Sequence, residues 1–365
     1  GAVQWVPGLR VRSAACLEAK RSNNAATPLA PAPVEACGEE VKSALFTYSE
    51  LFAGIGGFRA GLDWLGGRCV FASELDPEAR RMYEANYGDT PCGDITEIEA
   101  EDIAPHDLLT AGFPCQPFSS LGEQPGFEDA KGTLFLEIIR ILQACQPKCF
   151  ILENVSGLVW IDDAASLNEI LKALSAVGYH VSWRLINSRL VLPQHRVRLY
   201  IVGMRCDLVA SPETFSWPLL PVLDRVLTEI LEGPEVDSDS KYLLSESQYS
   251  KLLSSKEYQS DPERRHARLD GNARTLVSHY RCGSRSEFVF RAGMERPRFF
   301  TVNECARLQG FPASVLSPMI GYGNENRAYH QLGNAVSPVI IAAVAANLLH
   351  TLGISGARPG QLGPA

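Results

Sequence analysis

Short apolar runs alternate with amphipathic segments between about residues 44 and 205. The apolar runs predict strands, at 45–52, 69–74, 107–112, 148–154, 181–187 and 198–204. The segments between them repeat apolar residues at helical spacing and predict helices, at 57–66, 77–87, 132–145 and 164–177. Strands that alternate with helices are typical of an α/β fold, and we expect a doubly wound, mainly parallel sheet.

Two local patterns support these helices. Asp76 followed by Pro77 is a typical helix start, because an aspartate caps the first turn and a proline fits its first position. Phe58, Leu62 and Leu65 recur at helical spacing, so this face of the first helix should pack against the sheet.

The pattern changes near residue 218. Residues 218–298 hold short irregular segments, with an acidic stretch from Glu229 to Asp239 and then an arginine-rich part. We therefore expect a smaller second domain at 218–332, beside a larger domain at 44–217 that residues 333–352 complete.

Two helices are expected after the irregular region. Thr301-Val302-Asn303-Glu304 is a capping box that opens a helix ending at Gly310. A last apolar helix, at about 336–349, follows Gly333-Asn334 and should pack back on the first domain.

The composition is that of an ordinary globular protein. Hydrophobic residues make up 45% of the chain and charged residues 21%. The chain has no run of eighteen apolar residues, so we expect no membrane span. No secretory signal is visible, and the ten cysteines form no disulfide framework, so we expect a reducing compartment. The cysteines show no Cys-x-x-Cys pair or zinc-ligand spacing either, so we expect no metal. Residues 1–43 predict a disordered tail and 353–365 a flexible one, and the initial glycine indicates processing or truncation.

Positive charge is concentrated in one segment of an acidic chain. The net charge is −8, yet residues 264–298 carry nine arginines and three acidic residues, which is +6 for the segment (9 − 3) and −14 for the remainder (−8 − 6). Such a concentration is typical of a surface that docks phosphate backbones, and an ordinary solvated surface fits the charge equally well. The segment has no lysine, which favours recognition by the fork-shaped guanidinium group.

A glycine-rich turn follows the first predicted strand. The run Phe52-Ala53-Gly54-Ile55-Gly56-Gly57 lets the backbone approach a ligand closely, and Glu74 stands at the end of the next strand. An acidic residue there can accept hydrogen bonds from both hydroxyls of a ribose. The glycine spacing departs from the G-x-G-x-x-G of dinucleotide binders, which favours S-adenosylmethionine over NAD. Asp94, directly after Gly93, either reaches the adenine amino group or is an ordinary turn residue.

The loop GFPCQPFSS at 112–120 holds the candidate nucleophile. Cys115 lies between Pro114 and Pro117, directly after a predicted strand, and the prolines make the loop rigid. Open α/β sheets bind ligands at the carboxyl ends of their strands. A thiol held there suits nucleophilic attack, although most cysteines are inert core residues.

Three further charged residues are candidates for the same chemistry. Glu153 ends an apolar strand, where burial should raise its pKa and let it donate a proton to a ring nitrogen; the alternative is a structural helix cap. Arg196 and Arg198 lie on one side of an extended segment and could grip a phosphate or a polar ring edge; the alternative is a surface salt bridge.

Together these motifs resemble the DNA (cytosine-5)-methyltransferases in their unpermuted motif order. The resemblance covers about residues 44–350 and rests on LFAGIGGFRAGL, SELD at 73–76, GDIT at 93–96, GFPCQPFS, ENV at 153–155, QHRVRLY, ECARLQGFP at 304–312 and GNAVSP at 333–338. It implies a Rossmann-like fold that binds S-adenosylmethionine, with residues 218–332 as a target-recognition domain.

The resemblance also implies roles for the candidate residues. Cys115 would attack C6 of a cytosine flipped out of DNA, Glu153 would contact N3 and the exocyclic amine, and Arg198 with Arg196 would position the base and the glutamate. Carbon C5 would then take the methyl group, after which the C5 proton and the cysteine leave. The loop at 119–131 would be a lid over the flipped base.

Cofactor and DNA contacts follow from the same resemblance. The cofactor pocket would take Phe52, Gly54, Ile55, Gly57, Glu74, Leu75, Asp94, Ile95, Pro114, Leu134 and Asn334. Leu75 departs from the family, which often has a tryptophan there to stack on adenine, so we expect weaker cofactor affinity. Thr275-Leu276 matches a short signature of the target region, and the DNA-contacting residues would be Arg274, Thr275, Arg281 and Arg285.

Two alternatives remain open. The tRNA-methylating branch of the family tends to carry a Cys-Phe-Thr element in the target region, where this chain has Cys282-Gly283-Ser284. A non-catalytic cofactor-binding regulator is expected to lack Cys115 or Glu153, and both are present. We expect a monomer that acts on double-stranded DNA, without membrane or metal, wherever the cell keeps its DNA: the nucleus, the bacterial cytoplasm or nucleoid, or an organelle.

Overall fold

Six strands form one sheet in the order β2-β1-β3-β4-β6-β5. The computed structural model describes residues 44–113, 133–281, 287–315 and 324–354. Its strands are β1 (Phe46–Leu51), β2 (Gly67–Ser73), β3 (Leu108–Gly112), β4 (Cys149–Val155), β5 (Tyr179–Asn187) and β6 (Val197–Arg205). The first four in space run parallel, whereas β6 is antiparallel to both β4 and β5. The predicted mainly parallel sheet is confirmed, with β6 as a reversed strand.

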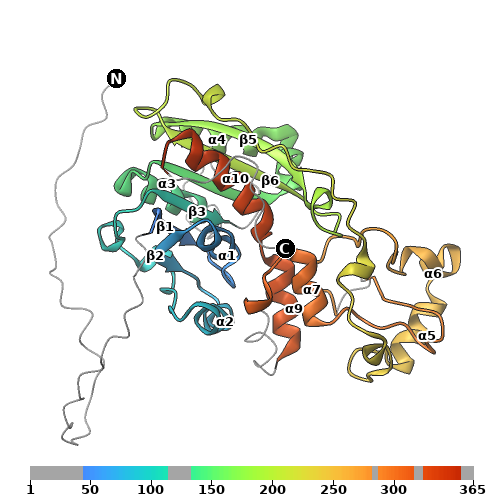
Figure 1. The fold of residues 1–365 in the computed structure, drawn as a ribbon. Coiled ribbons are helices and arrows are strands. Elements are labelled where there is room, and N and C mark those ends of the chain that lie inside the picture. Colours follow the sequence, from blue (N-terminus) through green and yellow to red (C-terminus); the bar gives the residue numbers. More distant parts are fainter. Residues whose placement is uncertain (1–43, 114–132, 282–286, 316–323, 355–365) are drawn as a thin grey trace, which may run out of the picture. The chain divides into compact units, whose positions relative to one another are not determined.

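Helices cover both faces of this sheet (Figure 1). Residues of β1, β3, β4 and β6 contribute alternately to two core clusters, because successive side chains of a strand point to opposite faces. Helices α1 and α10 pack into one cluster, and α3 and α4 pack into the other, which confirms the doubly wound arrangement. The α-helices are α1 (Gly57–Trp64), α2 (Pro77–Tyr87), α3 (Thr133–Cys145), α4 (Ala165–Ala176), α5 (Glu246–Ser254), α6 (Lys256–Ser260), α7 (Val302–Gln309), α9 (Glu325–Asn334) and α10 (Pro338–Thr351).

Local signals start and end several helices where they were predicted. The carboxylate of Asp76 accepts the N–H of Glu78 at 2.8 Å and caps α2. Thr301 and Glu304 form the capping box of α7, and Gly310 ends that helix in the left-handed conformation at φ 79°. These ends depend on neighbours in the sequence, which is why they could be predicted.

Helix α9 was not predicted, and the last helix begins at Pro338 rather than at 336. The buried stripe of α9 consists of little more than Ala328, Tyr329 and Leu332 among polar residues, too short to stand out as a period. The stretch from α9 through α10 is long and apolar enough to cross a membrane, but 89% of its apolar window is buried inside the protein. Helices α9 and α10 are therefore buried as the core helices of a globular protein are.

A third core cluster lies outside the sheet. It joins α7 and α9 to apolar residues of the irregular region, and it also includes Ile55, Ala60 and Met82. The described residues from 44 onward belong to one compact unit. The division into domains at 44–217 and 218–332 stays a prediction, as do the tails at 1–43 and 353–365, which lie almost wholly outside the described residues.

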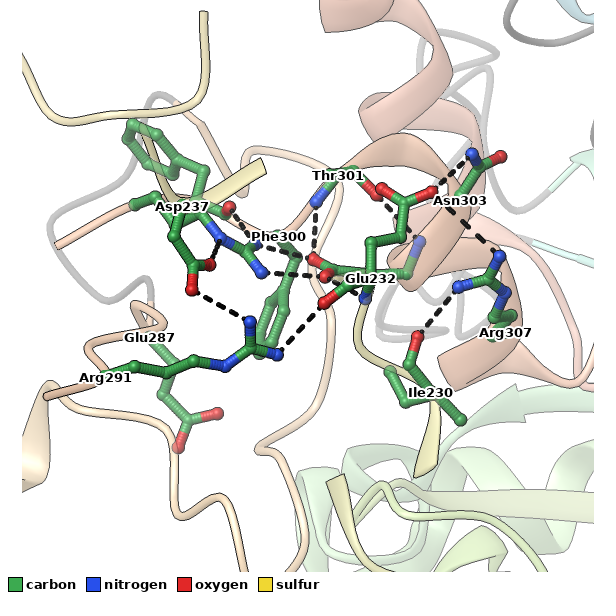
Figure 2. Close-up of polar contacts among 12 residues, drawn as sticks. Ile230, Glu232, Asp237, Glu287, Arg291, Phe300, Thr301, Asn303 and Arg307 are labelled. Atoms are coloured by element: carbon green, nitrogen blue, oxygen red, sulfur yellow. Dashed lines mark hydrogen bonds and ion pairs between the residues drawn. The ribbon is translucent and has the colours of Figure 1, made fainter. Parts of the chain in front are cut away.

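The acidic stretch folds back onto the arginine-rich segment (Figure 2). The carboxylate of Asp237 accepts hydrogen bonds from Nε of Arg298 at 2.7 Å and from Nη1 of Arg291 at 2.9 Å. Both Nη atoms of Arg298 donate to the carboxylate of Glu304, at 2.8 and 2.9 Å, and Arg298 and Glu304 are fully buried. The network fastens the loop before α5 to the start of α7.

This network corrects the expectation of one phosphate-docking surface across residues 264–298. Arg298 has no exposed surface, Arg291 also donates to the carbonyl of Glu232, and Arg265 is buried over the ring of Phe288. Net charge could not reveal this, because the ion-pair partners of an arginine are set by the fold. A buried arginine between carboxylates is a structural group and is not available to a phosphate.

Candidate active site

The carboxyl ends of four parallel strands and the beginning of β6 meet at one edge of the sheet. Because β6 runs in the opposite direction, its first residues lie beside the last residues of β4. A cavity of about 590 Å³ opens at this edge. It brings together eleven of the predicted site residues: Phe52, Gly54, Ile55, Gly57, Glu74, Leu75, Leu134, Glu153, Arg196, Arg198 and Asn334.

The other predicted residues of this site are not placed at the cavity. Asp94 caps a 3-10 helix (Ile95–Glu97) by accepting the N–H of Thr96 at 2.9 Å, and Ile95 is buried in the core of the sheet. Neither lines the cavity. Pro114, Cys115 and the predicted lid at 119–131 lie outside the described residues.

Glu74 holds the glycine-rich turn through its carboxylate. Its Oε2 accepts the N–H of Gly54 at 2.7 Å, and its Oε1 accepts the N–H of Asp76 at 2.8 Å. Gly54 adopts a φ of +56°, which favours glycine, and Phe52 adopts +53° although it is not glycine. Burial raises the pKa of Glu74. Each oxygen keeps a second lone pair, so the carboxylate can accept further hydrogen bonds from a ligand.

Apolar surface lies next to this carboxylate. Leu75 is 69% exposed and lines the cavity, as does Phe52. Gly57 packs directly against Val336, since a Cβ added to Gly57 would lie 2.7 Å from the side chain of Val336. The cavity therefore has a hydrogen-bonding carboxylate beside apolar walls, which is the usual character of a small-molecule site.

Glu153 and Arg198 form an ion pair at the same edge. Nε of Arg198 lies 3.3 Å from Oε1 of Glu153, and Arg198 pairs with Val155 across the antiparallel ladder. Glu153 is only 7% exposed. Burial raises the pKa of Glu153 and the two arginines oppose the shift, so the carboxyl takes up a proton more readily than an exposed one. The raised pKa expected from the sequence is confirmed.

The strand before Cys115 is fixed beside this pair. Gly112, at the end of β3, pairs with Glu153 on β4. The side chain of Asn154 donates to the carbonyl of Phe113 at 3.0 Å, directly before the loop. These contacts hold the chain beside Glu153 as far as Phe113, which is two residues before the cysteine.

Arg196 lines the cavity but forms a different set of contacts. Its guanidinium donates to main-chain carbonyls of Leu276, Gly333 and Ala335. Of the two arginines expected to hold Glu153, Arg198 forms the ion pair. Burial lowers the pKa of Arg196 to about 10.

The expected DNA-contacting residues lie in two settings. Thr275 donates its hydroxyl to the carbonyl of His195 at 2.7 Å, and Arg274 is exposed beside Glu287 at 3.6 Å. Arg281 is partly buried, pairs with Glu325 at 3.3 Å and lies over two aromatic rings. Arg285 lies outside the described residues.

A buried polar cluster behind the glycine-rich turn was not predicted. Glu50, fully buried on β1, accepts the hydroxyl of Tyr83 at 3.2 Å, and its Oε1 has no hydrogen-bond partner in the described part of the chain. Arg59 lies over the rings of Tyr83 and Tyr87, and the hydroxyl of Tyr87 donates to the carbonyl of Gly56 at 2.8 Å. Burial raises the pKa of Glu50 to about 8.

Several residues of the cavity wall were also missed. His330, Gln331, Ala335 and Val336 line it, and the side chain of Gln331 donates to Asp76 at 2.7 Å. His330 and Gln331 belong to the short polar helix α9, which was not predicted, whereas Ala335 and Val336 lie in the motif GNAVSP but were not singled out within it. Among the described residues, no group of three or more His, Cys, Asp or Glu could hold a metal ion.

Comparison with known proteins places this site in a family. A model of the C-5 cytosine-specific DNA methylases matches residues 46–350. Type II methyltransferase M.DsaV of Dactylococcopsis salina is 37% identical over 315 residues, which cover 83% of this chain and 85% of that protein. Type II methyltransferase M.HpaII of Haemophilus parainfluenzae is 38% identical over 331 residues, or 84% of this chain and 90% of that protein.

A solved structure has the same fold. The S. pombe Dnmt2 methyltransferase has a TM-score of 0.65 and 23% identity, and the match covers 84% of this chain and 99% of that one. At this identity the likeness supports the fold alone, and it confirms the expected Rossmann-like arrangement.

Proposed function

Because the chain belongs to the C-5 cytosine-specific DNA methylase family and is a DNA (cytosine-5)-methyltransferase, we propose that it takes its methyl group from S-adenosylmethionine and attacks its cytosine with Cys115. The family match favours DNA over the tRNA alternative and an enzyme over a non-catalytic regulator. One observation carries the proposal: a single cavity joins the expected cofactor residues to the Glu153–Arg198 pair.

Cys115 is proposed as the nucleophile. Its sulfur forms a bond to C6 of the cytosine, and the ring electrons move toward N3, where Glu153 supplies a proton. A buried glutamate whose pKa is raised suits that role, and Arg198 holds its carboxyl in place. After C5 has taken the methyl group and the proton on N3 has returned to Glu153, loss of the C5 proton and of the sulfur as a thiolate restores the aromatic ring and frees the cysteine.

The cavity fits S-adenosylmethionine. Glu74 can accept the two ribose hydroxyls, and Leu75 and Phe52 offer apolar surface to the adenine and to the sulfonium region. When bound, this cofactor supplies an electrophilic methyl group to C5. The expected contact of Asp94 with the adenine has no support in its position, because its carboxylate caps a short helix.

Double-stranded DNA is the proposed substrate, and the cytosine has to swing out of the duplex to reach this cavity. We propose that residues 218–332 recognise the target and that residues 44–217 with 333–352 carry the chemistry, in a protein that acts as a monomer inside the cell. Apart from Ile55, Ala60 and Met82, the buried residues of the third core cluster fall between Leu227 and Leu332, which supports a recognition part of about this extent.

Replacement of Cys115 by serine tests the nucleophile. The variant should transfer no methyl group to plasmid DNA while it binds S-adenosylhomocysteine as the parent does, because the cysteine is not among the groups proposed to hold the cofactor. Tritium transfer and calorimetry measure the two properties. Methylation near the parent's rate would overturn the assignment. Bisulfite sequencing of the same plasmid identifies the methylated sequence.

A second experiment tests the covalent step. Duplexes with 5-fluorocytosine at the target should become attached to the parent protein when S-adenosylmethionine is present, since fluorine at C5 cannot leave as a proton does. The adduct should be absent with the Cys115→Ser variant. Free protein and free duplex after incubation of the active parent would contradict the mechanism.

A further inference from the structure

Arg196 ties together two segments that are far apart in the sequence. Its Nη1 donates to the carbonyl of Leu276 at 2.9 Å, and its Nη2 donates to the carbonyls of Gly333 at 3.2 Å and Ala335 at 2.8 Å. The side chain is 3% exposed, and Nε has no hydrogen-bond partner in the described part of the chain. A buried guanidinium whose hydrogen bonds go to main-chain carbonyls fixes backbone positions.

The first of these segments runs alongside the residues before β6. The N–H of His195 donates to the carbonyl of Ala273 at 2.8 Å, and the hydroxyl of Thr275 donates back to the carbonyl of His195 at 2.7 Å. The buried side chain of Gln194 accepts the N–H of Leu276 at 2.8 Å. Residues 273–276 are therefore fastened along their whole length to the segment that carries Arg196.

The second segment is a wall of the cofactor cavity. Residues 333–336 line that cavity. On one side Gly333 touches the backbone directly after the first segment, because an added Cβ would lie 2.3 Å from main-chain atoms of Val277 and Ser278. On the other side Val336 packs against Gly57 of the glycine-rich turn. The wall thus lies between the expected DNA-contacting segment and the cofactor turn.

We propose that Arg196 is a positioning residue that couples DNA binding to cofactor binding. The inference rests on the proposed function, because it requires that Arg274 and Thr275 meet DNA. A duplex that docks there fixes residues 273–276, and the guanidinium of Arg196 transmits that constraint to residues 333–336 at the cofactor. By thermodynamic reciprocity, the bound cofactor tightens DNA binding by the same factor.

Calorimetry of S-adenosylhomocysteine binding measures this coupling. The titration is made with and without a saturating duplex that carries the sequence found by bisulfite mapping. For the parent we expect the duplex to lower the Kd at least about fivefold, the lower end of typical coupling between two sites. Arg196→Met keeps the apolar stem but removes the donors, so the ratio of the two Kd values should fall to near one.

Two further variants calibrate the result. Arg196→Lys keeps the charge but not the fork, so it should retain only part of the coupling. Arg205→Met is the matched control, because Arg205 lies at the other end of β6 and donates to the carbonyl of Gln146 at 2.7 Å. It should keep the parent's ratio. A parent ratio near one, or full coupling in Arg196→Met, overturns the proposal.

Kinetics separates positioning from direct chemistry. With both substrates saturating, the loss in Arg196→Met should fall mainly on the two KM values and much less on kcat. A large loss of kcat with the coupling retained would assign Arg196 to the reacting base instead and would overturn the proposal.

Hydrogen exchange on the parent gives a test that needs no variant. S-adenosylhomocysteine alone should slow amide exchange at 273–278, and the duplex alone should slow it at 333–336. Exchange that is unchanged in both segments overturns the coupling even if the enzyme methylates DNA. A protein that neither binds nor methylates any duplex contradicts the proposed function, and this inference then falls with it.

Discussion

Replacing Glu50 by glutamine should stabilise the protein at neutral and alkaline pH. Glu50 is fully buried, and the hydroxyl of Tyr83 donates to its carboxylate. Glutamine has nearly the same shape, and its side-chain oxygen can accept the same hydroxyl. The change removes a group that loses a proton readily in water but not at this position.

The magnitude follows from the pKa of Glu50, which burial raises from an ordinary value of 4.5 to about 8. Between these values the unfolded chain has lost the proton and the folded protein keeps it, so each pH unit costs the folded state about 1.36 kcal/mol. The cost is absent below the unfolded pKa. It reaches about 3 kcal/mol at pH 7 and levels off at about 5 kcal/mol above the folded pKa.

Thermal unfolding at about pH 4, 7 and 8.5, followed by circular dichroism, measures the effect. The Tm of Glu50→Gln should match the parent's at the lowest pH and exceed it by roughly 5 °C at neutral pH, since a chain of this size gains a few degrees for such a stabilisation. Glu84→Gln is the control, because Glu84 is exposed on α2 next to Tyr83 and should leave the curve unchanged.

Two outcomes would refute this reasoning. A variant that melts below the parent at the highest pH would mean that the ionised carboxylate stabilises the fold. A difference in Tm that stays constant with pH would mean that Glu50 titrates alike in the folded and unfolded states.

Four other substitutions test separate parts of the structure. Leu75→Trp should tighten S-adenosylhomocysteine binding roughly 2- to 10-fold, as aromatic stacking is worth about 0.5–1.5 kcal/mol; unchanged calorimetric affinity would show that this side chain does not face the adenine. Gly203→Ala should lower stability by about 1–3 kcal/mol, because its Cβ would lie 2.1 Å from the ring of Phe150; an unchanged urea midpoint contradicts that contact. Arg268→Ala should reduce the salt dependence of duplex binding by about one phosphate contact, whereas Arg298→Met should leave that slope intact and cost about 3–5 kcal/mol of stability; the reverse pattern would mean that the buried arginine meets DNA.

Much of the fold could be predicted because its signals are local. Apolar runs and helical spacing located the strands and most helices of the sheet, and Asp76 and Thr301 marked helix starts through side chains that reach only two or three residues. Glu74 and Glu153 were recognised as site residues because acidic groups at the ends of apolar strands are unusual.

The remaining features depend on partners distant in the sequence. The guanidinium of Arg196 has partners 80 to 139 residues away, and Asp237 lies 61 residues from Arg298, so no pattern along the chain indicated which groups these arginines contact. The burial of Glu50 could not be predicted either, since it comes from helices that cover β1. Composition and spacing describe neighbours along the chain, whereas burial is decided by packing.

The reversed direction of β6 has a consequence for how the proposed catalytic pair responds to denaturant. Glu153 and Arg198 lie two rungs apart on one antiparallel ladder, so separating them requires β4 and β6 to come apart. Such an opening is on the scale of global unfolding, whereas loops open at much lower free energy. Mild denaturant should therefore abolish methyltransferase activity while the ion pair of Glu153 and Arg198 is still intact. Activity should then return as fast as the loops close again.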